Sequence, residues 1–248
     1  MIRSARIVGS GLIGTSIGLC LKSAGIEIEM VDIDLKSAQL AQDLVKSNQI
    51  SQPDLILVAV PISANQKVIV EQLKANPNSI VCDLASVKSD LLVKVEELSD
   101  NPENFISLHP MAGREHSGAQ NARADLFIGR AWVVITGSKS SDKAKSVADA
   151  LIKICGGSPY QMSSKEHDLV VAQVSHLPQI LSSSLAASLL EISGDKLNIS
   201  GQGVRDLTRL ANSDSKLWSE ILLANQSSIT PSLEKLISHL QGLQKSLV

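Results

Sequence analysis

Short apolar runs and stretches of helical periodicity alternate over the first two thirds of the chain. The apolar runs predict strands over 5–9, 27–31, 54–60, 78–83, 104–108 and 131–136, with a weaker candidate at 158–163. Apolar residues at helical spacing predict helices over 12–24, 35–47, 63–75, 87–98 and 142–154. Gly25 follows the first of these helices at the C′ position. Near-continuous apolar strands that alternate with helices are typical of a parallel sheet covered on both faces.

The pattern becomes wholly helical after residue 163. Ser163, with Glu166 three residues later, forms a capping-box sequence at the start of a long amphipathic stretch, which Pro178 is expected to kink or interrupt. Further helices are predicted over 203–212, 214–228 and 230–246. We therefore expect two domains, residues 1–163 and 164–248. The second has wide apolar stripes but few residues for a core of its own, so it should pack on the first domain or on a second subunit.

Charge and cysteine content narrow the class of protein. The 25 acidic and 23 basic residues leave a net charge of −2, which offers no electrostatic footprint for nucleic acid or for an anionic membrane. The three cysteines stand in apolar segments without paired spacing, so they are expected to be small core residues rather than disulfide partners or zinc ligands. With no signal peptide or long apolar span in the sequence, these features predict a cytoplasmic globular protein without a metal site.

A glycine-rich turn follows the first predicted strand. In "IVGSGLIGTSIG", Gly9, Gly11 and Gly14 have the G-x-G-x-x-G spacing and lead into a helix. Gly9 allows a tight turn, Gly11 lets the backbone approach a pyrophosphate, and Gly14 lets the helix pack close to the strand. The backbone of the intervening residues Ser10, Leu12 and Ile13 faces the anion at the helix N-terminus. The turn predicts a dinucleotide site.

Asp32 follows the second predicted strand, 18 residues beyond Gly14. A carboxylate there can accept hydrogen bonds from the adenine ribose and would repel a 2′-phosphate, as would Asp34. The sequence therefore favours NAD over NADP, although Lys36 nearby leaves use of both open. Val60 and Pro61 end the third strand in a rigid turn expected to lie beside the dinucleotide.

Polar side chains also follow the next two strands. Ser86 and Lys88 are expected to project from the turn in "DLASVK", and His109 from the turn in "HPMAG", where the following proline keeps it extended. Ligands of doubly wound sheets bind beyond the carboxyl ends of the strands. His109 is therefore expected on the cofactor side, with a purely structural histidine as the alternative.

Two residues stand out in the helical region. His176 lies just before Pro178, and it either contacts a ligand or pairs with carbonyls freed by the proline. Arg205 follows a glycine turn and is either a ligand contact, solvated, or paired with Asp206. The other histidines, His116, His167 and His239, are expected at the surface or at helix ends.

The ordered motifs "VGSGLIGTSIG", "DLASVK", "HPMAG", "SHLP" and "GVRDLTRLANSDSKLWSEIL" resemble the prephenate/arogenate dehydrogenase family over roughly residues 5–228. The resemblance implies a Rossmann domain followed by a helical dimerisation domain, a homodimer, and an active site between the domains. It also implies NAD-dependent oxidative decarboxylation of prephenate or arogenate.

The resemblance further implies individual roles. His109 would be the catalytic histidine on the substrate's ring hydroxyl, and Ser86 would touch the same hydroxyl. His176 and Arg205 would bind substrate, with Arg205 on a carboxylate. Glu115 would gate the pocket, and Gly113 of the "HPMAG" motif would also contribute to the substrate site.

The chain departs from the family's pattern in two ways. Val204 stands where a phenylalanine is common, and we find neither a chorismate mutase segment nor an ACT-type module.

Two other functions compete with this one. A dehydrogenase of the β-hydroxyacid type would use a lysine in the helical domain, but the long helix carries "SHLP" and has Lys165 only at its start. A non-catalytic NAD-binding sensor would need the glycine loop and Asp32, but not Ser86, His109 and Arg205 together. The choice between prephenate and arogenate depends on pocket geometry and stays open.

Overall fold

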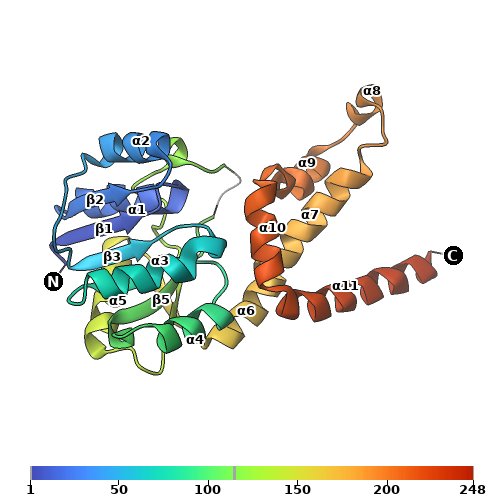
Figure 1. Ribbon diagram of the computed structural model, residues 1–248. Helices are drawn as coiled ribbons and strands as arrows, with labels where there is room; N and C mark the ends of the chain where they lie inside the picture. Colours follow the sequence, from blue (N-terminus) through green and yellow to red (C-terminus); the bar gives the residue numbers. More distant parts are fainter. Residues whose placement is uncertain (1, 114–115, 248) are drawn as a thin grey trace. The chain divides into compact units, whose positions relative to one another are not determined.

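A computed structural model describes residues 2–113 and 116–247 (Figure 1). The chain divides into two compact units, Met1–His167 and Asp168–Val248. The division falls four residues after the boundary expected from the change in sequence pattern.

The first unit is built on a seven-stranded sheet with the order β2-β1-β3-β4-β5-β6-β7. The strands are β1 (Ser4–Val8), β2 (Glu27–Val31), β3 (Leu55–Val58), β4 (Ile80–Asp83), β5 (Phe105–Pro110), β6 (Ala131–Ile135) and β7 (Ser158–Gln161). Strands β1 to β5 are parallel, whereas β6 runs antiparallel to β5 and β7 runs parallel to β6. The sheet is thus mostly parallel rather than wholly so. The described residues between β5 and β6 form only the short turn Ala119–Asn121, and a parallel pair would need a long crossover.

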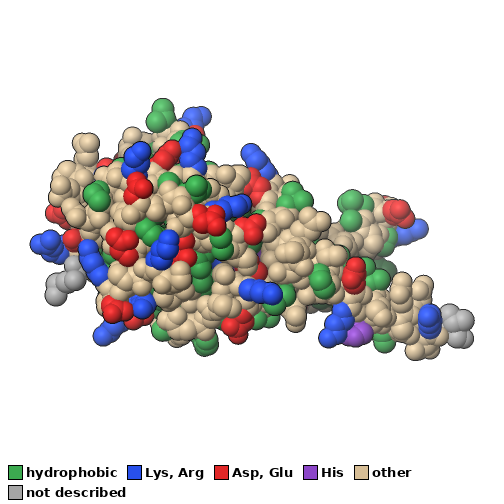
Figure 2. Space-filling model, turned by 60° about the horizontal axis from the view of Figure 1, so that its bottom comes forward, with side chains coloured by type: hydrophobic (Ala, Val, Ile, Leu, Met, Phe, Trp, Pro, Cys, Tyr) green, Lys and Arg blue, Asp and Glu red, His purple; other side chains and the backbone are tan. Residues whose placement is uncertain are grey.

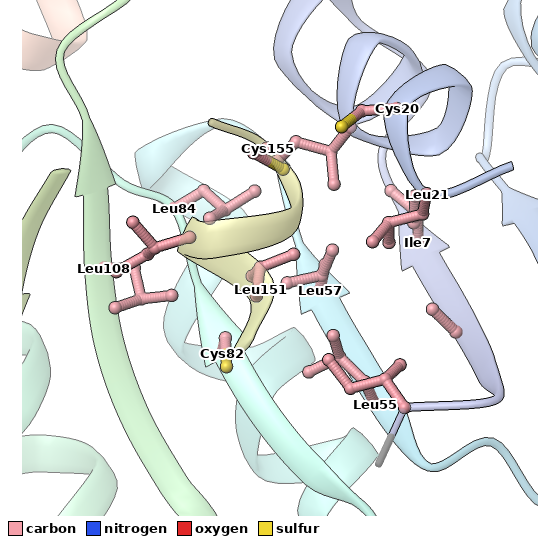
Figure 3. Packing of buried hydrophobic residues seen from close by; sticks show 14 of the residues in the cluster. Ile7, Cys20, Leu21, Leu55, Leu57, Cys82, Leu84, Leu108, Leu151 and Cys155 are labelled. Carbon is pink, nitrogen blue, oxygen red and sulfur yellow. The ribbon is translucent and has the colours of Figure 1, made fainter. Parts of the chain in front are cut away.

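Five helices cover the two faces of the sheet, as the periodicity predicts. They are α1 (Leu12–Ser23), α2 (Leu35–Val45), α3 (Ile62–Ala75), α4 (Ser89–Leu98) and α5 (Asp142–Ile154). Buried residues of α1, α2 and α5 share one apolar cluster with strand residues such as Ile7 and Leu57 (Figure 3). Residues of α3 and α4 form a second cluster with Ile56, Val58 and Val81, which point the other way. Because neighbouring strand residues face opposite sides, both faces of β3 are buried.

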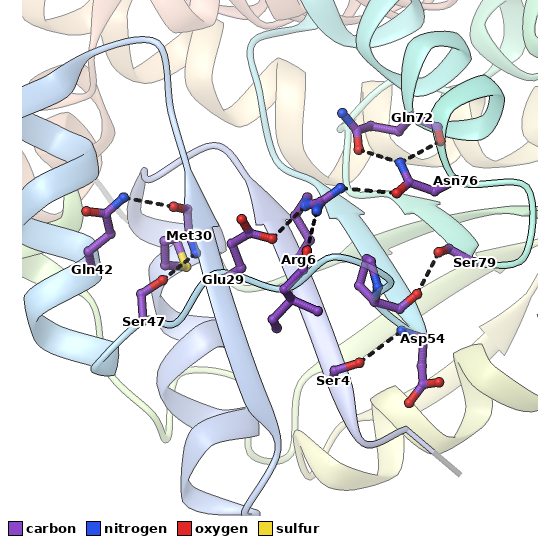
Figure 4. Close-up of polar contacts among 12 residues, drawn as sticks. Ser4, Arg6, Glu29, Met30, Gln42, Ser47, Asp54, Gln72, Asn76 and Ser79 are labelled. Carbon is purple, nitrogen blue, oxygen red and sulfur yellow. Dashed lines mark hydrogen bonds and ion pairs between the residues drawn. The ribbon is translucent and has the colours of Figure 1, made fainter.

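Polar side chains near the amino ends of the strands are closely paired (Figure 4). Arg6 Nε donates to Glu29 Oε2 at 2.7 Å, and its terminal nitrogens donate to the Ile50 carbonyl at 2.6 Å and to Asn76 Oδ1 at 3.2 Å. Ser79 Oγ donates to the Pro53 carbonyl at 2.6 Å. These bonds join the loops before β3 and β4 to the first two strands.

A long helical segment leads from the first unit into the second. Ser163 caps α6 (Ser164–Val171), since its Oγ accepts from the Glu166 amide at 3.2 Å. A π-helical stretch, Ala172–His176, then joins α6 to α7 (Leu177–Ser188), which has Pro178 in its first turn. Pro178 therefore interrupts the α-helix as predicted. The wider π turn accommodates a ring that would clash with the preceding turn of an α-helix.

The rest of the second unit is helical. It contains α8 (Gly194–Leu197), α9 (Gln202–Thr208), α10 (Ser215–Ala224) and α11 (Gln226–Ser246), with short 3-10 turns at Pro102–Asn104 in the first unit and Arg209–Asn212 in this one. The last two helices meet at Asn225 rather than near residue 229. The Asn225 side chain is buried and donates to the Asp168 carbonyl at 2.8 Å, which anchors the break there. Pro231 consequently lies inside α11.

Many apolar side chains of the second unit are exposed. Its described residues include only four buried apolar ones, Val171, Ala172, Ile221 and Ile229. On α11, Ile237, Leu240 and Leu243 are exposed, and apolar side chains reach the surface at several places on the face in Figure 2. Among the described residues, no helix has the length and apolarity needed to span a membrane.

Candidate active site

The glycine loop has the backbone that its spacing predicts. Gly9 has a φ of 109°, and a Cβ there would run into the Ala59 carbonyl. A Cβ on Gly14 would run into the Gly9 carbonyl, whereas one on Gly11 would meet open space. The first and third glycines thus permit close packing, and the second leaves the backbone at the start of α1 accessible to a ligand.

The residues between these glycines line the same turn. Ser10 is 1% exposed. Leu12, the first residue of α1, is buried, and the next residue, Ile13, is half-buried. The hydroxyls of Ser10 and Thr15 are buried and have no hydrogen-bond partner among the described residues. A buried polar atom without a partner costs stability and calls for an explanation, and a polar group bound at this turn would provide one.

Asp32 lies beside the glycine loop, at the carboxyl end of β2. Its carboxylate accepts from the Ser10 amide at 2.6 Å and from the Asp34 amide at 2.9 Å. Hydrogen bonds from Ser37 at the start of α2 lower the pKa of Asp34. The Asp32 carboxylate therefore stands next to the turn, as expected for a site that disfavours a 2′-phosphate, whereas the Asp34 carboxylate caps α2.

The loop after β3 closes the other side of the turn. The Ala59 amide donates to the Val8 carbonyl at 2.7 Å, which holds the two strand ends together. Val60 is half-buried, and Pro61 is exposed directly before α3. In the first turns of α3, Asn65 is 1% exposed, and both polar atoms of its side chain lack a partner among the described residues.

The turn after β4 differs from its prediction at Lys88. Ser86 is half-buried there, but Lys88 is wholly buried instead of projecting from the turn. Its Nζ lies 2.6 Å from Asp83 Oδ2 and donates to the Leu108 carbonyl at 2.7 Å. A buried ammonium needs an anionic partner, and Asp83 provides it. Lys88 therefore fixes the backbone of β5 one residue before His109.

His109 is the next-to-last residue of β5 and is half-buried. It pairs in register with Val133 of β6, so the strand extends two residues beyond its predicted end. Its Nδ1 lies 2.8 Å from Nε2 of His167, and the two rings meet edge to face. His109 thus stands at the carboxyl edge of the sheet, as predicted, with its Nδ1 within hydrogen-bond distance of His167.

His167 was expected at the surface or at a helix end, and it does lie near the start of a helix, but it is buried rather than exposed. The residue is fully buried in the first turn of α6, where its amide donates to the Ser163 carbonyl at 2.9 Å. The capping motif that predicts this helix start also places His167 on its first turn, but only the packing brings it to His109. The exposed positions predicted for His116 and His239 are confirmed.

The predicted substrate residues after His109 are only partly described. Gly113 is exposed, with open space around it, and Glu115 lies outside the described residues.

His176 has the surroundings of a packed interior residue. It is 1% exposed, its Nδ1 lies 3.1 Å from Asn225 Nδ2, and its ring meets Trp218 edge to face. These contacts are those of a packed core histidine, although they are made with Asn225 and Trp218 rather than with carbonyls beside Pro178. Its substrate contact stays a prediction.

Arg205 lies on the exposed surface of α9. Its Nε donates to Gln202 Oε1 at 3.2 Å, and Gln202 in turn donates to Asp206 Oδ1 at 2.7 Å. The guanidinium is therefore steadied by Gln202 while remaining accessible to a ligand.

The three cysteines are core residues, as predicted. Burial raises the pKa of Cys82, and Asp83 raises it further. A hydrogen bond with Cys20 and burial raise the pKa of Cys155, and the same hydrogen bond lowers that of Cys20.

Comparison with known proteins identifies the family. Residues 17–159 match the prephenate dehydrogenase nucleotide-binding domain, and residues 163–248 match the prephenate dehydrogenase dimerization domain. The prephenate dehydrogenase of Lactococcus lactis is 32% identical over 96% of this chain and 69% of its own length.

Two solved structures resemble the whole chain. One is the prephenate dehydrogenase of A. aeolicus in complex with hydroxyphenyl propionate and NAD+, which is 26% identical with a TM-score of 0.89, covering 100% of this chain and 91% of that one. The other is the arogenate dehydrogenase of Synechocystis, also 26% identical, with a TM-score of 0.78 and coverage of 98% and 91%. The two matching domains cover nearly all of the sequence in the order that its motifs predict, and the chain therefore belongs to the prephenate dehydrogenase family.

Proposed function

We propose that the protein catalyses the NAD-dependent oxidative decarboxylation of prephenate or arogenate. The observation that carries this proposal is the position of His109. It stands half-buried at the carboxyl edge that also carries the glycine loop, and its ring is engaged at Nδ1. A group that must accept a proton from one hydroxyl needs this kind of fixed direction.

The glycine loop and Asp32 would hold NAD. The open approach to Gly11, the unpartnered hydroxyls of Ser10 and Thr15, and the Asp32 carboxylate beside the loop fit a pyrophosphate and an unphosphorylated ribose. When bound, NAD+ supplies the hydride acceptor. The related A. aeolicus enzyme is described with NAD+, which supports this choice.

His109 would act as the base, with Ser86 hydrogen-bonding to the same ring hydroxyl. As the carbinol hydrogen leaves as hydride, the hydroxyl proton passes to the neutral imidazole and the C–O bond becomes a carbonyl. The ring carboxylate then leaves as carbon dioxide, and its bonding electrons complete the aromatic ring. The proton returns from the imidazole to the phenolate oxygen, so the residue ends the cycle unchanged.

Arg205 would hold a carboxylate of the substrate. A forked guanidinium binds a carboxylate through two parallel hydrogen bonds, which a lysine cannot do. Its exposure and its bond to Gln202 suit this role.

The helical unit would form a homodimer. Its exposed apolar residues on α11 need a covering surface, and the matched family domain is a dimerization domain. Light scattering should give twice the chain mass for the wild type, and Leu240→Asp should lower that mass. A monomeric wild type at micromolar concentration would contradict the proposal.

The assay for the proposed function compares three substrates. Purified protein with saturating NAD+ should form NADH from prephenate, from arogenate, or from both, and not from a simple β-hydroxyacid. The ratio of kcat/KM for the two ring substrates fixes the preference. Turnover of the β-hydroxyacid alone would favour the competing dehydrogenase class. If none of the three substrates gives NADH, the non-catalytic NAD-binding sensor is the remaining hypothesis.

A further inference from the structure

We infer that His167 is a positioning residue that holds His109 in the tautomer able to act as a base. The inference deepens the proposed function and rests on His109 being the proton acceptor. It starts from one contact, the 2.8 Å between His109 Nδ1 and His167 Nε2. That distance is a full hydrogen bond, so one proton lies between the two nitrogens.

The position of that proton decides what His109 can do. If His167 donates, Nδ1 of His109 is the acceptor and its Nε2 carries the hydrogen, so a neutral His109 cannot accept at Nε2. If His109 donates from Nδ1, its Nε2 has the lone pair that a base requires. A neutral histidine side chain in water prefers the proton on Nε2. A partner that accepts at Nδ1 is therefore needed to reverse that preference.

The surroundings of His167 hold its side chain in one place. The side chain is fully buried, and the Ser163 cap fixes the first turn of α6, on which it stands. On the other side, Lys88 Nζ holds the Leu108 carbonyl at 2.7 Å, so the backbone next to His109 is fixed as well. Both halves of the contact are therefore attached to rigid structure.

The same bond acts during turnover. When His109 accepts the substrate proton at Nε2, it becomes a cation and its Nδ1–H bond to His167 becomes charge-assisted, which is roughly twice as strong as a neutral bond. His167 then stabilises the protonated base without touching the substrate.

Two substitutions of matched length test the inference. His167→Gln places an amide oxygen near the position of Nε2 and keeps an acceptor, whereas His167→Met has similar length and no such acceptor. Ring nitrogen shifts of isotope-labelled histidine, assigned by comparison with His109→Asn, report the tautomer of His109 without substrate. We expect the Nδ1–H form in the wild type and in His167→Gln, and the Nε2–H form in His167→Met.

The kinetics should follow the tautomer. We expect kcat of His167→Met to fall at least about tenfold, a part of the ~100- to 10,000-fold that a general base contributes. His167→Gln should stay within about threefold of the wild type, and KM for NAD+ should change little in either. A wild-type His109 in the Nε2–H form, or equal loss of kcat in both variants, would overturn the inference.

The tautomer is measured without turnover, so the two proposals fail separately. If the wild type forms no NADH from prephenate or arogenate, the proposed function is wrong. The nitrogen chemical shifts of the His109 ring would still determine its tautomer. If His167→Met does not fold, the wild-type and His167→Gln spectra decide it.

Discussion

Among the described residues, the two ends of the parallel strands differ in how completely their buried polar side chains are paired. Near the amino ends, Arg6, Glu29 and Asn76 are joined by short hydrogen bonds that link loops to strands (Figure 4). Near the carboxyl ends, Ser10, Thr15 and Asn65 are buried with unpartnered polar atoms, and His109 is half-exposed. Paired polar groups stabilise a fold, while unpaired ones cost stability and are kept where a ligand uses them. We therefore expect side chains near the amino ends to contribute mainly to folding stability, and those near the carboxyl ends to contribute mainly to ligand binding and catalysis.

The largest effect should come from the carboxyl end. His109→Asn should lower kcat by about 100-fold or more, which is ~2.7 kcal/mol or more in the activation barrier, because no neutral base remains. The dissociation constant for NAD+ and the melting temperature should change little. Near-wild-type turnover would exclude His109 as the base.

Substitutions near the amino ends of the strands should lower the stability of the fold rather than kcat. Arg6→Met leaves the Glu29 carboxylate without its ion-pair partner. The loss is costly because the two side chains are only 17% and 14% exposed. We expect a loss of about 2–3 kcal/mol in the free energy of unfolding, somewhat below the ~3–5 kcal/mol for fully buried pairs. Urea unfolding measures it, and a double variant with Glu29→Met should regain part of the loss. A lower kcat in the folded Arg6→Met protein would contradict the claim that side chains near the amino ends affect stability and not catalysis.

Arg205 extends the comparison to the helical unit. Arg205→Lys keeps the charge and loses the fork, so KM for the ring substrate should rise about tenfold, or ~1.4 kcal/mol, while KM for NAD+ stays the same. Arg209→Lys, four residues on, is the matched control. An equal rise in that control would assign the effect to the charge of the helix surface rather than to Arg205.

The smallest effect should come from Asp32. Asp32→Asn removes the charge that opposes a 2′-phosphate, and kcat/KM for NADP+ relative to NAD+ should rise about fivefold, or ~1 kcal/mol. Asp34→Asn is the control, since Asp34 does not contact the glycine loop in the described structure and should change the ratio less. An unchanged ratio in Asp32→Asn would remove Asp32 from the choice of cofactor.

The sequence predicts the parts of this fold that depend on local pattern. The strands, the helices on both faces, the cap at Ser163 and the interruption at Pro178 follow from apolar periodicity and backbone restriction. The antiparallel β6 was not foreseen, because strand direction depends on how the chain crosses between β5 and β6. The break at Asn225 was also missed, since it depends on a bond to the distant Asp168.

The site was predictable where a motif carries its own geometry. The glycine loop and the strand-end position of His109 are of this kind. The burial of Lys88 is not, because it depends on the Leu108 carbonyl of the neighbouring strand as well as on Asp83. The contact of His167 with His109 is not either, because it joins residues 58 positions apart. A histidine near the start of a helix gave no local signal of that contact.

The most direct measurement is the stoichiometry of a single reaction mixture. Wild-type protein with NAD+ and prephenate should form NADH, carbon dioxide and the aromatic 4-hydroxyphenylpyruvate in equal amounts, and arogenate should likewise give tyrosine if it is the preferred substrate. NADH without an aromatic product would contradict coupled decarboxylation. No NADH from either substrate at saturating NAD+ would contradict the proposed function itself.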